Sequence, residues 1–280
     1  MTFVDRLLNV DRRIIYLLVF VAAVIPFLFP VDIEIKVTPE VRSIYNFIEN
    51  HPEGTVMMLA SDYDPQTQAE NDPQARAMMR HMFRKGHKVI VMALSQDGAA
   101  LTEMMTNSVS KEYGKRYGED YVYLGYKPYP NIIILSMGED FRLSYPKDYY
   151  NTKLDELPMM RNIKNYDDLA GVLEVGGGNV STMWITSAVE RYNVKLAVAV
   201  TAVSGPQYYA NLQAGQLFGL MGGLKGAAEY EMLLKDEYIR LKAPLKAIQG
   251  MNVQNFVHVL IILLTIIGNI AFFYKKRIGS

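Results

Sequence analysis

Apolar segments at the two ends of the chain constrain its fold most. Residues 14–30 (IIYLLVFVAAVIPFLFP) carry no charged side chain, and residues 256–274 (FVHVLIILLTIIGNIAFFY) are interrupted only by His258, Thr265 and Asn269. Because an α-helix rises about 1.5 Å per residue, about 20 apolar residues cross a hydrocarbon layer of about 30 Å. We therefore predict a transmembrane helix over each segment, with a folded domain between them.

The first segment also has features of a secretory signal. However, Phe27, Phe29 and Pro30 stand where signal cleavage requires small residues. An uncleaved signal anchor is the better interpretation. Residues 1–13, which precede it, place apolar side chains at helical spacing. This pattern is typical of a short cytoplasmic segment lying at the membrane interface.

Positive residues next to the spans predict their orientation. Loops on the cytoplasmic side of a membrane carry an excess of Lys and Arg close to the spans. Arg6, Arg12 and Arg13 precede the first span. Lys275, Lys276 and Arg277 follow the second span, in the tail 275–280. The domain side has Lys36, Arg42, Lys242 and Lys246. We therefore expect a cell-membrane protein with both termini in the cytoplasm and an extracytoplasmic domain.

The middle of the chain alternates short apolar runs with amphipathic segments. We predict strands over 55–60, 88–94, 121–126, 131–137, 171–175 and 195–203, and helices over 69–85, 98–116 and 179–192. Continuous apolar strands between helices indicate an α/β fold with a mainly parallel sheet and helices on both faces. Residues 31–235 are assigned to this domain, and 236–255 to an amphipathic helical connector that leads into the second span.

Charge and residue usage exclude several classes of function. Lys plus Arg total 29 and Asp plus Glu total 29, so the net charge is zero. This balance argues against nucleic acid as a partner, since such binding needs a basic excess gathered on one face. The chain contains no cysteine, which excludes disulfides, zinc–thiolate sites, iron–sulfur clusters and thiol catalysis.

An acidic cluster follows the first predicted strand of the domain. Asp62 and Asp64 are spaced by one residue, and two such carboxylates can share a divalent cation, which is the one cofactor this sequence favours. The pattern resembles the Asp-x-Asp of haloacid-dehalogenase-type phosphatases, but Gln66 stands where that family has Thr or Val. The alternative is a turn that begins a helix, where Asp is favoured as a cap.

A glycine run follows the predicted strand 171–175. Backbone amides of Gly176, Gly177, Gly178 and Asn179 can bind a phosphate or carboxylate group there. Neither a dinucleotide fingerprint nor a P-loop is present, and glycine also serves simply to turn the chain tightly. Membrane serine peptidases of the Clp-protease-like class also have glycines before a Ser-bearing helix, but no base for Ser181 is identifiable.

Residues 211–234 carry small residues at four-residue intervals: Gly215, Gly219, Gly223 and Ala227. In a single helix these would lie close to one face. Glycine inside a helix costs about 1 kcal/mol relative to alanine, so we expect close approach by another helix to offset the loss. That helix would belong to the same domain, to a neighbouring subunit, or lie at the membrane surface.

Four stretches carry a resemblance to a known family: YGEDYVYLGYKP, DYYNTKLDELPMM, NYDDL and GQLFGLMGGLKGAAEYE. They resemble an uncharacterised family of prokaryotic membrane-anchored α/β proteins, over most of residues 40–235. The resemblance implies the layout of the chain but transfers no activity. The same layout is similar to that of auxiliary proteins associated with transporters of the gliding type.

Three hypotheses for function follow. The first is a non-enzymatic membrane-anchored scaffold whose domain forms a homo-oligomer through the glycine-faced helix. The second is a membrane-bound hydrolase, or a binding protein for a phosphorylated or carboxylated ligand, that uses Asp62, Asp64 and the turn 176–178. The third is an accessory subunit of a transporter, with a membrane-protein partner. The expected partners in all three include membrane lipid. The sequence shows no complete catalytic constellation, which favours the first.

Overall fold

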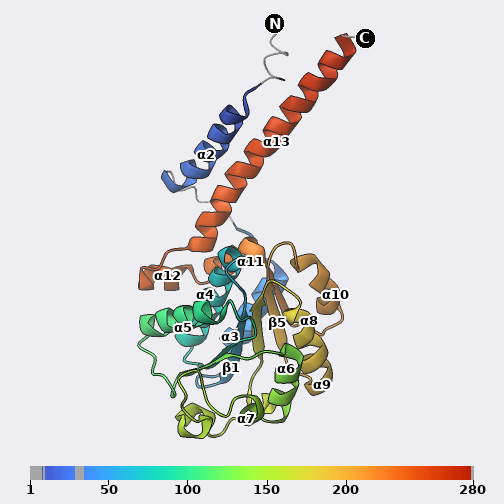
Figure 1. Ribbon diagram of the computed structural model, residues 1–280. Helices are drawn as coiled ribbons and strands as arrows, with labels where there is room; N and C mark the ends of the chain where they lie inside the picture. Colours follow the sequence, from blue (N-terminus) through green and yellow to red (C-terminus); the bar gives the residue numbers. More distant parts are fainter. Residues whose placement is uncertain (1–7, 9, 29–34, 279–280) are drawn as a thin grey trace. The chain divides into compact units, whose positions relative to one another are not determined.

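The structure is a computed structural model that describes residues 8, 10–28 and 35–278 (Figure 1). The chain divides into two compact units. Residues 35–247 form an α/β unit, and residues 1–34 with 248–280 form the other. Residues 1–7 and 9 of the predicted interfacial segment lie outside the described residues.

Six parallel strands form one sheet in the order β3-β2-β1-β4-β5-β6. They are β1 (Val56–Asp62), β2 (Lys88–Ala93), β3 (Tyr121–Tyr126), β4 (Val172–Gly176), β5 (Leu196–Val200) and β6 (Gly219–Gly222). Most of their residues are buried, as expected for strands covered on both faces. The strand order reverses direction between β1 and β4, which are hydrogen-bonded neighbours. The predicted α/β class and parallel sheet are confirmed.

Helices cover both faces of the sheet. On one face lie α3 (Pro39–Asn50), α4 (Gln68–Arg84), α5 (Ala99–Glu112) and α11 (Gly223–Leu233). The other carries α6 (Pro130–Glu139), α7 (Phe141–Ser144), α8 (Val180–Trp184), the π-helical turn η4 (Ile185–Val189), α9 (Glu190–Tyr192) and α10 (Tyr209–Gln213). The core of this second face joins alternate strand residues, such as Met58 and Val198, to Trp184 and Met137. Side chains two apart in a strand share a face.

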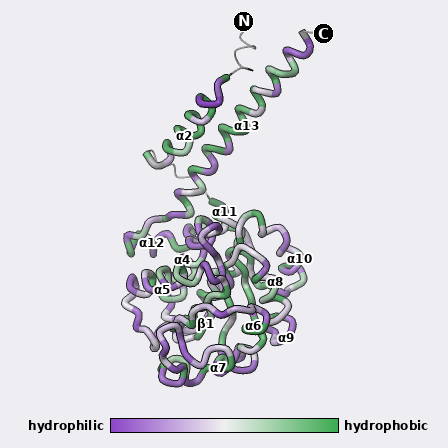
Figure 2. Tube along the Cα trace, viewed as in Figure 1, coloured by the Kyte–Doolittle hydropathy of each residue, from purple (hydrophilic) through white to green (hydrophobic). Residues whose placement is uncertain are grey.

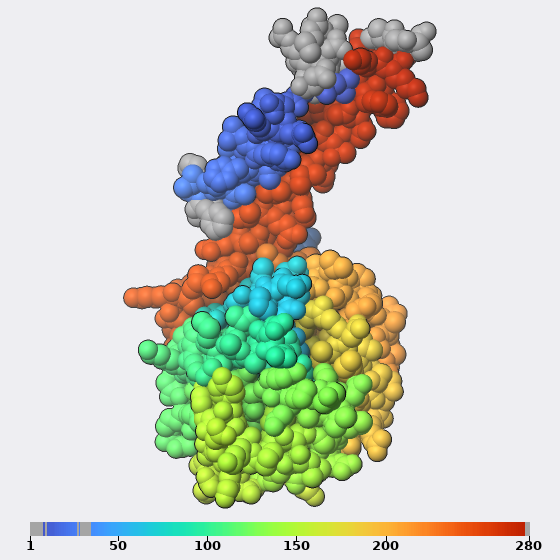
Figure 3. Space-filling view, in the orientation of Figure 1, coloured from blue at the N-terminus to red at the C-terminus, as the bar shows by residue number. Residues whose placement is uncertain are grey.

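The segment 140–169 packs over the α6 side of the unit instead of forming a linker (Figure 3). It contains the short turns η1 (Leu154–Glu156), η2 (Pro158–Met160) and η3 (Tyr166–Asp168). Arg142 holds it together by donating to the carbonyls of Met160 (2.9 Å) and Ile163 (2.7 Å) and to Asp155 (2.6 Å). The Arg142 guanidinium therefore supplies hydrogen-bond donors to two carbonyl groups of this irregular segment.

The predicted strand 131–137 is wrong. These residues lie in helix α6, which begins at Pro130, a residue favoured in the first turn of a helix. A short apolar run has no periodicity that separates a buried strand from a buried helix, so Ile133 and Ile134 fit either. Pro130 is the residue that distinguishes them.

The predicted single helix through residues 211–234 is also wrong. Gly215 lies in a turn with φ +75°, Gly219 begins β6, Gly223 begins α11 with φ +58°, and Ala227 lies inside α11. These residues therefore share no helical face. Gly219 nevertheless serves helix packing within the domain, because a Cβ there would stand 2.4 Å from Cγ1 of Ile44 on α3. The apolar run before Gly223 forms the buried strand β6, which pairs in parallel with β5.

The terminal helices are apolar and exposed. Helix α2 spans Arg12–Leu28, and α13 spans Lys246–Ile278, preceded by α12 (Lys235–Leu241). Figure 2 shows hydrophobic residues along both α2 and α13. Among the described residues, one helix, Lys246–Arg277, is long and apolar enough to cross a membrane. The N-terminal span stays a prediction, because α2 has 17 described residues and residues 29–30 lie outside the described part.

We expect Gly219→Ala to destabilise the α/β unit. The added methyl group would overlap Ile44 at 2.4 Å and approach the Glu40 carbonyl oxygen at 3.1 Å, and overpacking of this kind costs about 1–3 kcal/mol. Urea unfolding of the full chain in detergent, followed by fluorescence of its one tryptophan, the buried Trp184, measures the change. Gly222→Ala is the matched control, since nothing lies within 4 Å of a Cβ there. Equal stabilities of the two variants would contradict the close approach of α3.

Candidate functional site

The candidate site lies where the strand order reverses, at the carboxyl ends of β1 and β4. Asp62 ends β1 and Gly176 ends β4, and the two residues are register partners. In open parallel sheets, ligands bind outside the carboxyl ends of the strands at such a switch point, because the loops there diverge to opposite faces. The two places that the sequence singles out, the acidic cluster and the glycine turn, are therefore brought together.

Asp62 is buried and accepts two hydrogen bonds from separate elements. Its Oδ1 accepts from the amide of Leu94, just after β2, at 2.5 Å, and its Oδ2 accepts from Nε1 of Trp184 at the end of α8, at 3.1 Å. The residue is 6% exposed. This carboxyl group thus ties the ends of β1 and β2 to the helix that follows β4.

Glu174 lies two residues before Gly176 and so shares the Asp62 face of the sheet. It is fully buried, and its Oε2 accepts a hydrogen bond from the Ser181 hydroxyl at 2.7 Å. Its Oε1 has no partner, and a Cβ on Gly176 would stand 2.3 Å from that oxygen. Only glycine at position 176 leaves room for the Glu174 carboxyl group.

Burial changes the protonation of both acids. Removal from water raises the pKa of Asp62 to about 7, against the pull of its two donors. Burial and the nearby Asp62 charge raise the pKa of Glu174 well above its ordinary value. Both acids therefore keep a proton to a higher pH than an exposed carboxyl group does. Such a pair can take up or release a proton when charge arrives nearby.

A tyrosine completes the buried wall of the site. Tyr145, which follows α7, is fully buried and its hydroxyl has no partner. Burial and the charge of Asp62 raise the pKa of Tyr145, so the phenol keeps its proton. Two unpartnered polar atoms, the Tyr145 hydroxyl and Oε1 of Glu174, thus belong to the surroundings of Asp62. Buried polar atoms without partners are rare in proteins and call for an explanation.

Asp64 has a different role from Asp62. Its Oδ1 accepts from the amides of Gln66 (2.9 Å) and Thr67 (3.0 Å), so it caps the turn that leads into α4. The two carboxylates therefore serve different partners, and their pairing on one cation gains no support. Among the residues that the structure describes, no group of three or more His, Asp or Glu side chains can hold a metal ion.

The glycine turn forms the open rim of the site. Thr67 packs against Gly177, where a Cβ would lie 2.4 Å from its Cγ2, and Asn71 donates to the Gly176 carbonyl at 3.4 Å. Gly178 and Asn179 are exposed, and a Cβ on Gly178 would meet nothing within 4 Å. No described residue accepts a backbone hydrogen bond from the amides of Gly177 and Gly178.

Glu174 is a residue of the site that the sequence motifs do not include. Glu174 is the one acid inside the apolar run GVLEV, and an acid in a strand buried on both faces is a signal that could have found it. Ser181 was considered as a nucleophile, but it is fully buried and donates to Glu174. The π-helical turn η4, which begins directly after Trp184, could not be predicted; such turns are frequent at functional sites.

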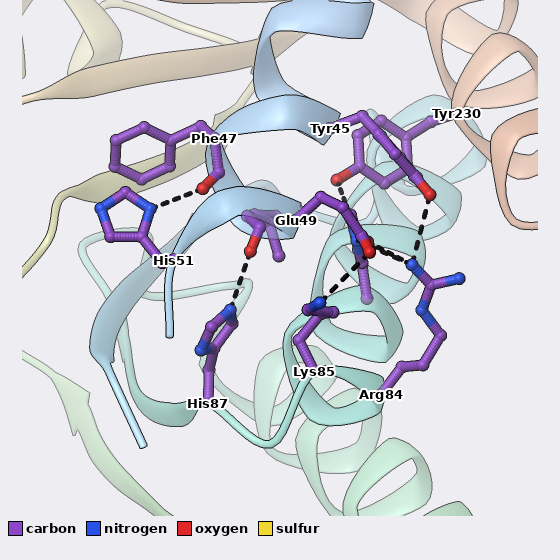
Figure 4. Close-up of polar contacts among 10 residues, drawn as sticks. Tyr45, Phe47, Glu49, His51, Arg84, Lys85, His87 and Tyr230 are labelled. Atoms are coloured by element: carbon purple, nitrogen blue, oxygen red, sulfur yellow. Dashed lines mark hydrogen bonds and ion pairs between the residues drawn. The ribbon is translucent and has the colours of Figure 1, made fainter. Parts of the chain in front are cut away.

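A second polar cluster joins α3, α4 and α11 (Figure 4). Glu49 accepts from His81 Nε2 (2.8 Å), from Lys85 (3.2 Å) and from Arg84, while His81 Nδ1 pairs with the Tyr230 hydroxyl at 2.8 Å. Burial lowers the pKa of His81 to about 4, and its donors lower the pKa of Glu49 to about 2. Both nitrogens of His81 are paired, so this cluster fastens helices together.

No family model, curated protein or solved structure matches this chain.

We expect Glu174→Gln to change how stability depends on pH. A raised pKa in the folded state means that wild-type stability is fully present below the unfolded-state pKa of about 4.5 and is lost as pH rises. The glutamine variant lacks this loss, so its advantage over the wild type should grow between about pH 4 and pH 8. Urea unfolding followed by Trp184 fluorescence measures it, and the exposed Glu139→Gln is the control. A constant difference across this range would show that Glu174 is ionised in the folded protein.

Proposed function

We propose that this protein is a membrane-anchored binding protein for a small carboxylated or phosphorylated ligand, held at the switch point between β1 and β4. The observation that carries the proposal is the buried acid pair Asp62 and Glu174 beneath the open glycine turn. The amides of Gly177 and Gly178 supply donors for an anionic group. The acid pair makes anion binding depend on pH, because a bound anion favours the protonated form of Asp62.

Binding is better supported than hydrolysis. A nucleophile must reach the substrate and have a base within hydrogen-bond distance. Ser181 is fully buried, so a substrate cannot reach its hydroxyl, which donates to Glu174. Asp62, which is held by Leu94 and Trp184, suits a fixed binding wall.

The scaffold hypothesis has lost one of the three features that supported it, the glycine spacing. Self-association was expected through a glycine-faced helix. Residues 211–234 instead contain the end of α10, all of β6 and all of α11. Homo-oligomer formation and an accessory role beside a transporter stay predictions. Light scattering of the detergent-solubilised chain tests the first, and copurification at fixed stoichiometry tests the second.

Membrane anchoring at both ends is part of the proposal. Helix α13 has large apolar side chains that are exposed on all sides, among them Ile262, Ile266, Ile270 and Phe273. Helix α2 likewise exposes Leu17, Phe20 and Val21. Exposed apolar surface of this extent requires lipid or a partner. Basic residues in the last turn of α13, Lys275, Lys276 and Arg277, favour a cytoplasmic C-terminus.

We expect a cysteine at position 280 to be shielded from an impermeant maleimide and one at position 139 to react. The natural chain has no cysteine, so Ser280→Cys and Glu139→Cys each give a single label without background. Intact spheroplasts of a bacterial host should label Glu139→Cys, which is exposed on the α/β unit. Permeabilised cells, in which both variants should react, are the control. The opposite pattern would invert the proposed topology.

We expect succinate or inorganic phosphate to shift the amide resonances of Gly177 and Gly178. The full chain, labelled with ¹⁵N-glycine, is titrated in detergent with each anion separately. We expect a dissociation constant on the order of 1 mM. Gly54 and Gly114 are internal controls, because a Cβ on either would meet nothing within 4 Å and neither belongs to the site. Equal shifts at all four glycines, or none, would rule out an anion site at this turn.

The acid pair predicts the pH dependence of this binding. Sulfate keeps a constant charge between about pH 6 and pH 8, whereas Asp62, with a pKa of about 7, loses its proton over that range. Sulfate affinity at the glycine turn should therefore rise several-fold as pH falls. In Asp62→Asn the profile should be flat. A flat wild-type profile would separate the glycine turn from the acid pair and leave no proton-linked site.

A further inference from the structure

A second polar pocket lies on the opposite face of the sheet from Glu174, within residues 35–247. It has a volume of about 260 Å³ and is lined by side chains of α4, α5, α11, α12 and the first residue of α13. Pockets for drug-sized molecules are larger, at about 300–1,000 Å³. The volume therefore suits a small group or the end of a larger ligand.

The acids of this pocket are already engaged. Glu112 accepts from Nε and Nη2 of Arg80 at 2.7 and 2.8 Å, a bidentate pair that neutralises both side chains. Glu231, which is 1% exposed, accepts from the amide of Ala247 at 3.1 and 3.0 Å, at the beginning of α13. Glu112 is therefore neutralised by Arg80, and the oxygens of Glu231 are engaged by a backbone donor.

Three donors of the pocket keep hydrogen-bonding capacity that no described residue uses. Lys246 is exposed at its mouth, and no described residue pairs with its ammonium group. Arg76 uses Nε on Asp72 at 2.7 Å, which leaves both terminal nitrogens. Tyr238 is 1% exposed and its hydroxyl forms no hydrogen bond. Burial raises the pKa of Tyr238, so the hydroxyl keeps a proton to donate.

We infer that this pocket binds a phosphate group through Lys246, Arg76 and the Tyr238 hydroxyl. The lining of the pocket holds three basic side chains against two carboxylates and adds the neutral Tyr238 donor, a balance that favours an oxyanion. A divalent cation would instead need uncommitted carboxylates. The inference is independent of the proposed ligand at the glycine turn, since no residue is shared between the two sites.

The phosphate group has two sources of the same chemistry, an anionic lipid headgroup or a soluble phosphate compound. Phe256, where the apolar stretch of α13 begins, is the tenth residue after Lys246. Ten residues span at most about 35 Å even when fully extended. A lipid of the same membrane is therefore within reach of the pocket, as is any soluble phosphate on that side.

The test titrates inorganic phosphate by calorimetry into the full chain in a detergent without phosphorus. Lys246→Gln should weaken binding about tenfold, the loss expected for one charge-assisted contact, and Lys246→Arg should restore it. Lys242→Gln is the matched control, because Lys242 is exposed on the same segment and does not line the pocket. Equal weakening by both glutamine variants would overturn the inference, because it would reduce the effect to net charge.

Tyr238→Phe separates binding from folding. It removes only the unpartnered hydroxyl, so the melting temperature should stay constant or rise, while phosphate affinity falls severalfold. Native mass spectrometry with phosphatidic acid or phosphatidylcholine then tests the lipid source. Selective retention of phosphatidic acid that is lost in Lys246→Gln assigns the pocket to a headgroup. Phosphate binding without lipid retention assigns it to a soluble compound, and neither form binding overturns the inference.

Discussion

A sheet of parallel strands must be covered on both faces, and this requirement arranges the rest of the α/β unit. Each connection between neighbouring strands has to cross over a face, and the crossovers divide between the two faces where the order changes direction. Between β1 and β4 the following helices, α4 and α8, depart to opposite sides. Asp62 and Gly176 end those two strands, so a carboxyl group and a glycine turn lie at the point where the strand order reverses.

Burying the acid pair Asp62 and Glu174 at this switch point lowers the stability of the fold, so the presence of the pair calls for an explanation. An ionised carboxylate removed from water is destabilising unless paired, and a buried acid without a cationic partner avoids the cost by keeping its proton. Within the described part of the chain, no lysine or arginine is bonded to Asp62 or Glu174; their donors are an amide, an indole and a hydroxyl. Apolar residues would satisfy β4 as well as Glu174 does. Packing alone does not require an acid at this position, and this supports the proposed ligand site.

Much of the architecture could be predicted from the sequence, because buried parallel strands read as unbroken apolar runs. The failures occurred where that signal is ambiguous. Residues 131–137 satisfy strand and helix alike, and β6 is only four residues long, between glycines that the spacing argument had assigned to a helix. At the site, the acidic cluster and the glycine turn were found. Glu174 and Trp184 were not, because their importance depends on register and crossing helices that no local pattern encodes.

Two clusters, whose pKa values shift in opposite directions on folding, make the stability of the α/β unit depend on pH. In the helix cluster the pKa of His81 falls from 6.5 to about 4 and that of Glu49 from 4.5 to about 2, so its stability is present above the unfolded values and is lost as pH falls. At the switch point the pKa of Asp62 rises from 3.8 to about 7, so the stability of that pair is present at low pH and is lost as pH rises. The helix cluster thus limits the acid side and the candidate site limits the alkaline side. A ligand that keeps Asp62 protonated would relieve only the second limit, and this couples occupancy of the site to stability near neutral pH.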